Sequence, residues 1–158
     1  QVEHDVRSAV QTLFREGKNL IVGSAPGVDH FALDEMRTLS ADASRFKVIL
    51  PTTLPYYIER LSAWAATQTD PSSKEHVAEQ IALLSTIEKT TPQSLVQGPE
   101  IEVHKMEETD YKAMNDRIVH GADELEAFQV DGSSGTQDAI DEARSLGKRV
   151  VVHSYHTL

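Results

Sequence analysis

Apolar residues recur at helical spacing in several stretches of this chain. Val6, Val10 and Phe14 share one stripe, which predicts a helix near residues 2–16 that ends at Gly17. The same period predicts further helices over residues 28–39, 54–69, 74–89, 110–121 and 137–146.

Short apolar runs lie between the predicted helices and indicate buried strands at residues 19–22, 46–50, 101–104, 125–130 and 149–153. Residues 90–100 are polar and contain prolines, which predicts a loop. Strands that alternate with helices favour a single α/β domain over residues 1–158, a Rossmann-like three-layer sandwich with a mostly parallel sheet. Because such folds usually open with a strand and this chain opens with a helix, we expect a first strand and its loop to precede Gln1.

Residues 131–136, Asp-Gly-Ser-Ser-Gly-Thr, are the most informative segment for function, because they join a predicted strand to a predicted helix. Gly132 and Gly135 allow the backbone to turn and to approach a ligand closely. The first N–H groups of a helix lack partners within it, and the helix dipole adds positive charge there. This segment is therefore a candidate phosphate site, although a plain connection has the same appearance.

A second segment of the same kind, Gly-Ser-Ala-Pro-Gly at residues 23–27, follows the predicted strand at residues 19–22. Asp29 lies at the start of the next helix, where it either binds a ribose hydroxyl or only caps the helix. In an open parallel sheet both loops emerge at the carboxyl ends of the strands, which is where ligands bind.

Composition narrows the function classes. The formal net charge of -10 disfavours a nucleic-acid partner, and no apolar run is long enough to predict a membrane span. The absence of cysteine excludes disulfides and thiolate chemistry and fits a cytoplasmic protein. We expect no metal and no cofactor, because the pair His153 and His156 lacks a carboxylate at ligand spacing.

Three segments together carry a resemblance to a known family. Residues 23–29 resemble the Gly-Gly-x-x-Gly-hydrophobic-Asp segment of the SLOG superfamily, which groups the DNA-processing Smf proteins, the LOG phosphoribohydrolases and YspA/YpsA-like Rossmannoid proteins. Residues 115–123 look like the helix that leads into their penultimate strand, and residues 128–136 are similar to their second nucleotide loop. The last segment also resembles the Asp-x-Gly-Thr segment of nucleoside 2-deoxyribosyltransferases.

The resemblance implies a Rossmann-like fold and a nucleotide-derived ligand, but it does not carry over the catalysis. LOG hydrolases and deoxyribosyltransferases place a glutamate three residues after the threonine of Gly-Thr, and that position here is Ala139. The Arg-Lys pair of LOG enzymes aligns with Met114 and Asn115. Asp131 and Asp138 remain as catalytic candidates, although a helix rotates Asp138 by about 100° from the family position.

The sequence thus predicts a nucleotide-binding sensor or carrier module. A nucleotide N-glycosidic bond hydrolase or transferase is the first alternative, and a structural interaction domain is the second. The apolar stripes of residues 54–89 predict a homodimer interface, and Tyr56 or Tyr57 is either a base-stacking residue or a core residue. The predicted ligand-binding residues are Gly23, Ser24, Ala25, Gly27, Asp29, Asn115, Arg117, Asp131, Gly132, Ser133, Ser134, Gly135 and Thr136.

Overall fold

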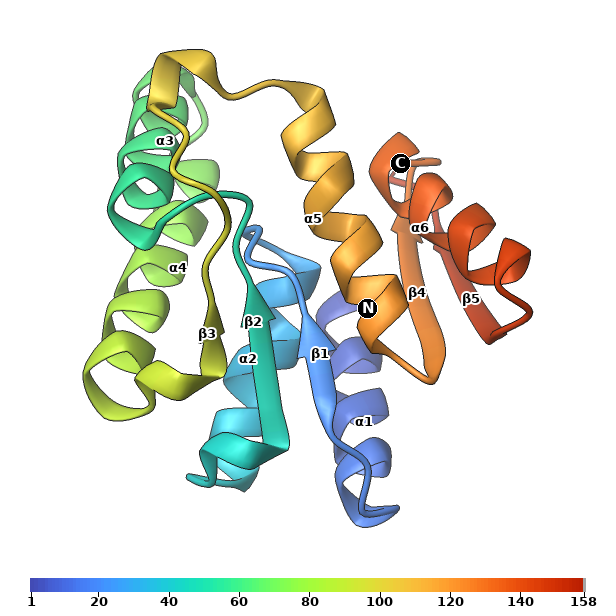
Figure 1. Cartoon of the computed structure of the whole chain (residues 1–158). Helices are drawn as coiled ribbons and strands as arrows, with labels where there is room; N and C mark the ends of the chain where they lie inside the picture. The colour runs from blue at the N-terminus through green and yellow to red at the C-terminus, as the bar shows by residue number, and fades with distance from the viewer. Residues whose placement is uncertain (158) are drawn as a thin grey trace.

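The structure is a computed structural model that describes residues 1–157, and it has an α/β fold (Figure 1). Its α-helices are α1 (Val2–Arg15), α2 (Val28–Leu39), α3 (Leu54–Thr67), α4 (Pro71–Thr90), α5 (Glu108–Gly121) and α6 (Ser134–Ser145). Its strands are β1 (Leu20–Val22), β2 (Phe46–Ile49), β3 (Leu95–Val96), β4 (Glu124–Val130) and β5 (Arg149–Tyr155).

The strands form two parallel sheets instead of one. β2 lies between β1 and β3 in the first sheet, and β4 pairs with β5 in the second. The register joins Val22 to Val48 in the first sheet and Ala127 to Val152 in the second. Within residues 1–157 no ladder joins β1 to β4, so the single sheet that we predicted is divided at this point.

Helices lie on both sides of the strands (Figure 1). α1 packs beside α2 on one side, and α5 packs beside α6 on the other. The main core joins α1 to α4 with β1 and β2, and its largest fully buried side chains include Phe46, Leu33, Met36, Leu54 and Leu84.

Local sequence signals explain where the helices begin and end. Gly17 adopts φ +72° after α1, and the Lys18 N–H donates to Leu13 O, as in a Schellman motif. Asp70 caps α4 by accepting hydrogen bonds from the N–H groups of Ser72 and Ser73. These termini confirm the predicted stop at Gly17 and extend the predicted helix at residues 74–89 toward Pro71.

Two predictions of local structure were wrong. The predicted strand at residues 101–104 is irregular chain that enters a 3₁₀ turn, Val103–Lys105. Thr52 holds this segment, because its hydroxyl accepts from Ile101 N and donates to Pro99 O. The predicted loop at residues 90–100 contains β3, which pairs with β2 through Leu95 and Val96.

None of the helices within residues 1–157 combines the length and the apolar character that crossing a membrane requires.

Candidate functional site

The first glycine loop, residues 23–27, follows β1 and leads directly into α2. Gly27 takes φ +99°, a conformation that glycine adopts at no steric cost, and it stands at the N-cap position of α2. No side chain among residues 1–157 caps this helix, so its first N–H groups are free of side-chain partners there. An open helix start of this kind is suited to an anion.

Ser24 is buried, and two side chains from distant helices hold its backbone. The Tyr57 hydroxyl donates to Ser24 O at 2.9 Å, and Gln80 Nε2 donates to the same oxygen at 2.7 Å. Burial raises the pKa of Tyr57 above its ordinary value. Tyr57 is therefore a core residue that fixes the loop, and base stacking is not its role.

Gln80 is a residue that the sequence prediction missed. It is fully buried on α4, and its amide oxygen lies 2.8 Å from His30 Nδ1. Because the Gln80 amide nitrogen donates to Ser24, its oxygen must accept, and His30 Nδ1 therefore carries the proton. The pair connects the start of α2 to the loop that precedes it.

Asp29 turns back toward its own loop. Its Oδ2 accepts from Ala25 N at 3.0 Å, and a Cβ atom added at Gly23 would lie 2.5 Å from that oxygen. Burial raises the pKa of Asp29 to about 6, and the Ala25 hydrogen bond only partly opposes this shift. The carboxylate thus closes the loop, and its charged form is held at a cost that is typical of functional sites.

The second glycine loop forms a tight turn after β4. Asp131 and Gly132 take positive φ values of 49° and 67°, and the Ser133 hydroxyl caps α6 by accepting from Thr136 N. α6 begins at Ser134 rather than at the predicted Gln137, so Ser134, Gly135 and Thr136 form its first turn. The N–H groups of Ser134 and Gly135 have no partner within the helix.

α5 brings the two loops to one edge of the molecule. Met114 Sδ lies 3.8 Å from Ser24 Oγ, and Ile118 Cδ1 lies 3.4 Å from the Cβ position of Gly23. One residue after Met114, Asn115 Nδ2 lies 3.7 Å from the Cβ position of Gly135. One helix therefore contacts both predicted ligand loops.

Arg117 lies on α5 between the residues that contact the first loop. Its Nη2 donates to Leu50 O at 2.6 Å, just beyond the carboxyl end of β2. The side chain is half-buried, and no carboxylate within residues 1–157 forms an ion pair with it. A guanidinium has five N–H donors, so most of its donors remain for an anionic ligand.

The two catalytic candidates, Asp131 and Asp138, differ in their surroundings. Both carboxylate oxygens of Asp131 accept from Thr157, one from its N–H and one from its hydroxyl. The Thr157 hydroxyl and N–H lower the pKa of Asp131. Asp138 is exposed on α6, next to Ala139. Within the described part of the chain no group of three or more His, Asp or Glu side chains is placed to hold a metal ion.

Comparisons with protein-family models, with curated proteins and with solved structures found no match to this chain.

Proposed function

We propose that this protein binds a nucleotide or a nucleotide-derived small molecule at the edge where α5 contacts the loops at residues 23–27 and 131–136. Free N–H groups at the starts of α2 and α6 hold the phosphate, and Arg117 supplies the positive charge. The observation that carries this proposal is the position of α5, which contacts Ser24 with one side chain and approaches Gly135 with the next.

We also propose that the parallel strands belong to a Rossmann-like sandwich. A Rossmann-like sandwich of the SLOG type is supported by parallel strands with helices on both sides and by loops at one edge. Asn115 and Asp29 are placed near the loops, where they recognise the sugar or the base. The role is a sensor or carrier.

The enzymatic alternative is less well supported. Cleavage of an N-glycosidic bond needs a carboxylate at the anomeric carbon, and Ala139 occupies the family position. Asp131 already accepts two hydrogen bonds from Thr157, and Met114 is buried beneath the first loop. We therefore rank binding above catalysis.

A thermal-shift screen tests the proposal directly. The ligands are nucleosides, nucleoside mono- and diphosphates, cyclic nucleotides, NAD and ADP-ribose. A ligand at about 100 times its Kd should add roughly 2.7 kcal/mol of stability, which raises Tm by several degrees. Absence of a shift with every ligand would contradict the proposal and favour an interaction domain. Release of free base would favour the enzyme.

Two substitutions locate the site once a ligand is found. Gly135→Val places two methyl groups beside Asn115 without requiring a strained backbone, and it should abolish binding. Arg117→Met should weaken a phosphate-bearing ligand about 10- to 100-fold, because a hydrogen bond to a charged group contributes about 1.5–3 kcal/mol. Arg117→Lys retains the charge and should recover part of the affinity.

The controls are Ala113→Val, which places a valine side chain at an exposed position of α5, and Arg144→Met, which repeats the Arg117→Met change at an exposed position of α6. Both should bind as the parent protein does. Equal affinity in Gly135→Val and Ala113→Val would remove the second loop from the site.

A further inference from the structure

Tyr111 on α5 lies on the face of this helix that contacts both glycine loops. Successive residues of an α-helix are turned by about 100°, so Tyr111 is about 60° from Met114 and about 40° from Asn115, on the side between them. Met114 contacts Ser24 in the first loop, and Asn115 approaches Gly135 in the second. The Tyr111 side chain therefore projects between the two loops.

Tyr111 also lies further out than Met114 and Asn115. α5 begins at the edge of the molecule toward which β1 and β4 run, and it returns alongside these strands (Figure 1). Since each helical residue adds about 1.5 Å, Tyr111 is about 4.5–6 Å nearer to that edge than the other two residues. Helical side chains lean toward the amino end of their helix, which carries the ring further in the same direction. Tyr111 therefore stands at the carboxyl ends of the strands, where ligands of open α/β sheets bind.

The Tyr111 side chain is supported by the core but keeps an open end. It is half-buried and packs against the main core. The hydroxyls of Tyr57 and Tyr155 donate hydrogen bonds, whereas that of Tyr111 forms none within residues 1–157. In this range Thr91 Oγ1 is the one buried side-chain oxygen or nitrogen without a partner, so the Tyr111 hydroxyl is accessible to solvent. A rigid ring held in this way suits a planar ligand.

Tyr57 connects Tyr111 to the first loop. Burial raises the pKa of Tyr57, the hydrogen bond to Ser24 opposes this shift, and the neighbouring Tyr111 and Asp29 raise the pKa further. Tyr111, Tyr57 and Asp29 therefore lie around the same loop. Of the two rings, that of Tyr57 is committed to the core, and that of Tyr111 remains for a ligand.

We propose that Tyr111 is the base-stacking residue of the ligand site, an assignment that rests on the proposed function. The ligand then carries a nucleobase, which lies against the Tyr111 ring at the outer edge. Its sugar and phosphate lie deeper, beside Asn115 and Arg117, which follow Tyr111 by about 6 Å and about 9 Å along the axis of α5. Tyr111 thus distinguishes a nucleotide from a bare sugar phosphate.

Two kinds of probe test the role of Tyr111. AMP, GMP, CMP and UMP carry a base, and ribose 5-phosphate has the same sugar and phosphate without one. Calorimetric titration gives the Kd of each probe for the parent protein and for Tyr111→Leu, which keeps an apolar side chain but removes the aromatic face. The nucleotide that binds most tightly should lose at least about 5-fold in affinity, because base stacking on an aromatic ring contributes this much or more. Ribose 5-phosphate should bind both proteins equally.

Two further variants serve as controls. Tyr111→Phe retains the aromatic ring and should bind every probe as the parent protein does. Tyr56→Leu makes the same change as Tyr111→Leu at the half-buried Tyr56 of α3, and it should leave all affinities unchanged.

Nuclear Overhauser effects give a readout that does not require a weakened protein. With isotope-labelled tyrosine, the base protons of the bound nucleotide should show contacts to one tyrosine ring. These contacts should disappear in Tyr111→Phe, which still binds. Contacts that persist in Tyr111→Phe, or that are absent from the parent protein, would overturn the assignment.

The binding measurements have their own contrary outcomes. Equal losses for the nucleotide and for ribose 5-phosphate in Tyr111→Leu would make Tyr111 a structural support of the loops. A loss confined to Tyr56→Leu would assign the base to α3. Either result overturns the role of Tyr111 and leaves the proposed function standing. Failure of every probe to bind the parent protein also overturns this role, and the proposed function then depends on the wider ligand screen.

Discussion

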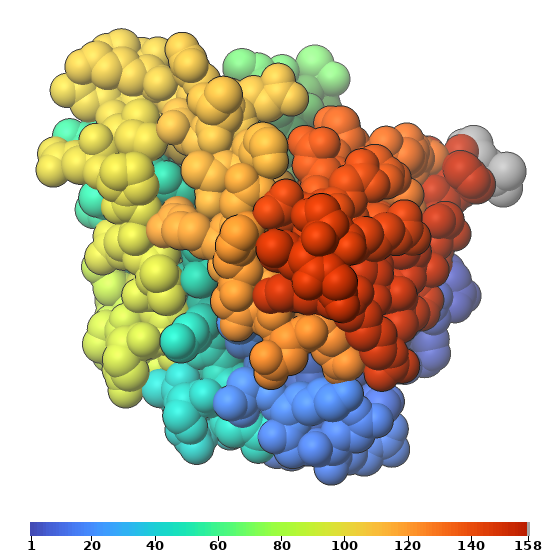
Figure 2. Space-filling view, turned by 45° about the vertical axis from the view of Figure 1, so that its right-hand side comes forward, coloured from blue at the N-terminus to red at the C-terminus, as the bar shows by residue number. Residues whose placement is uncertain are grey.

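The two sheets of this protein differ in how deeply they are buried. In the first sheet Phe46 and Val48 of β2 are at most 1% exposed, and helices α1 to α4 surround them. In the second sheet most residues of β5 are half-buried, and Phe128 is the one β4 or β5 residue that joins the fully buried part of the main core within residues 1–157. Figure 2 shows the carboxyl-terminal residues, in red, gathered at one side of the molecule.

The chain therefore has a first half, α1 to β3, that is packed into the main core, and a second half, β4, α6 and β5, that is buried less deeply. Four buried residues of α5, β4 and α6 lie outside the main core: Val119, Ala127, Ile140 and Ala143. Since the free energy of local opening follows buried apolar contact, the β4–α6–β5 half should open more readily than the first half.

The largest expected effect is a cavity in the first half. Leu84 is fully buried in the main core, so Leu84→Ala should lower the free energy of unfolding by about 2–5 kcal/mol. Urea unfolding followed by circular dichroism measures this, and Leu146→Ala at an exposed position is the control. A cost below 1 kcal/mol would contradict the first half as the stable body.

A cavity in the second half should act locally. Ile140 is 2% exposed, and Ile140→Ala removes contacts of about 2–4 kcal/mol. Amides of β4 and β5 should exchange faster in this variant, whereas those of β2 should not. Faster exchange of β2 by the same factor would mean that the halves unfold together and would abolish the distinction.

A substitution at Asp29, which closes the loop at residues 23–27, should have an intermediate effect on stability. Burial raises the pKa of Asp29 to about 6 from 3.8, so its neutral form stabilises the fold below about pH 4 and this contribution is lost as pH rises through about 6. Asp29→Asn should therefore add up to about 3 kcal/mol at pH 8 and little at pH 4. Tm measured at pH 4 and at pH 8 tests this prediction, and Asp138→Asn at an exposed position is the control.

The smallest effect concerns the junction between the halves. Lys148 Nζ donates to Val119 O at 2.7 Å and to the carbonyls of His120 and Ala122, so it caps the carboxyl end of α5. Lys148→Met should cost about 1 kcal/mol and loosen α6 more than β2. Lys89→Met, in the last turn of α4, is the matched control. Equal losses in the two variants would leave Lys148 without a special role.

The helices could be predicted from sequence because their apolar period and their caps agree, and α2 was predicted to the residue. β3 could not be predicted, because Leu95 and Val96 stand in a polar stretch and form a strand only by contact with β2. Gln80 gave no signal either: its partner Ser24 is 56 positions away in the chain. Both glycine loops were predicted, but the α5 contact that joins them depends on packing.

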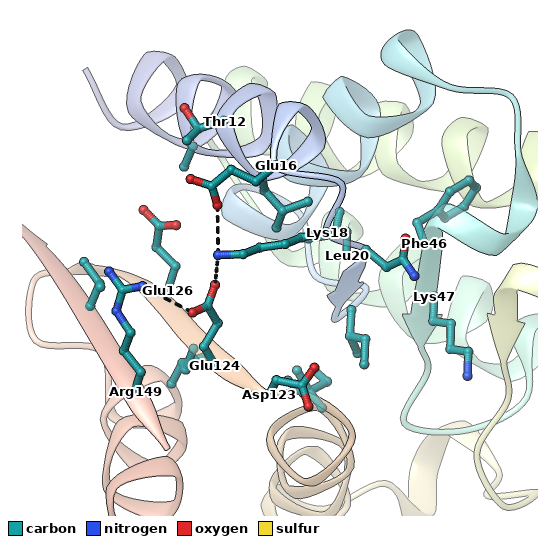
Figure 3. Close-up of a pocket in the computed structure, with 18 of the residues that line it drawn as sticks. Thr12, Glu16, Lys18, Leu20, Phe46, Lys47, Asp123, Glu124, Glu126 and Arg149 are labelled. Atoms are coloured by element: carbon teal, nitrogen blue, oxygen red, sulfur yellow. Dashed lines mark hydrogen bonds and ion pairs between the residues drawn. The ribbon is translucent and has the colours of Figure 1, made fainter. Parts of the chain in front are cut away.

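The ion pairs of Glu124 with Lys18 and Arg149 have a consequence for handling the protein (Figure 3). Unpaired strand edges are templates for intermolecular β-aggregation, and charged side chains are the usual gatekeepers against it. Lys18, Glu124 and Arg149 lie at the amino ends of β1, β4 and β5, and their charges are screened at high salt. We expect colloidal stability to fall as ionic strength rises, and screening of the net charge of -10 acts in the same direction.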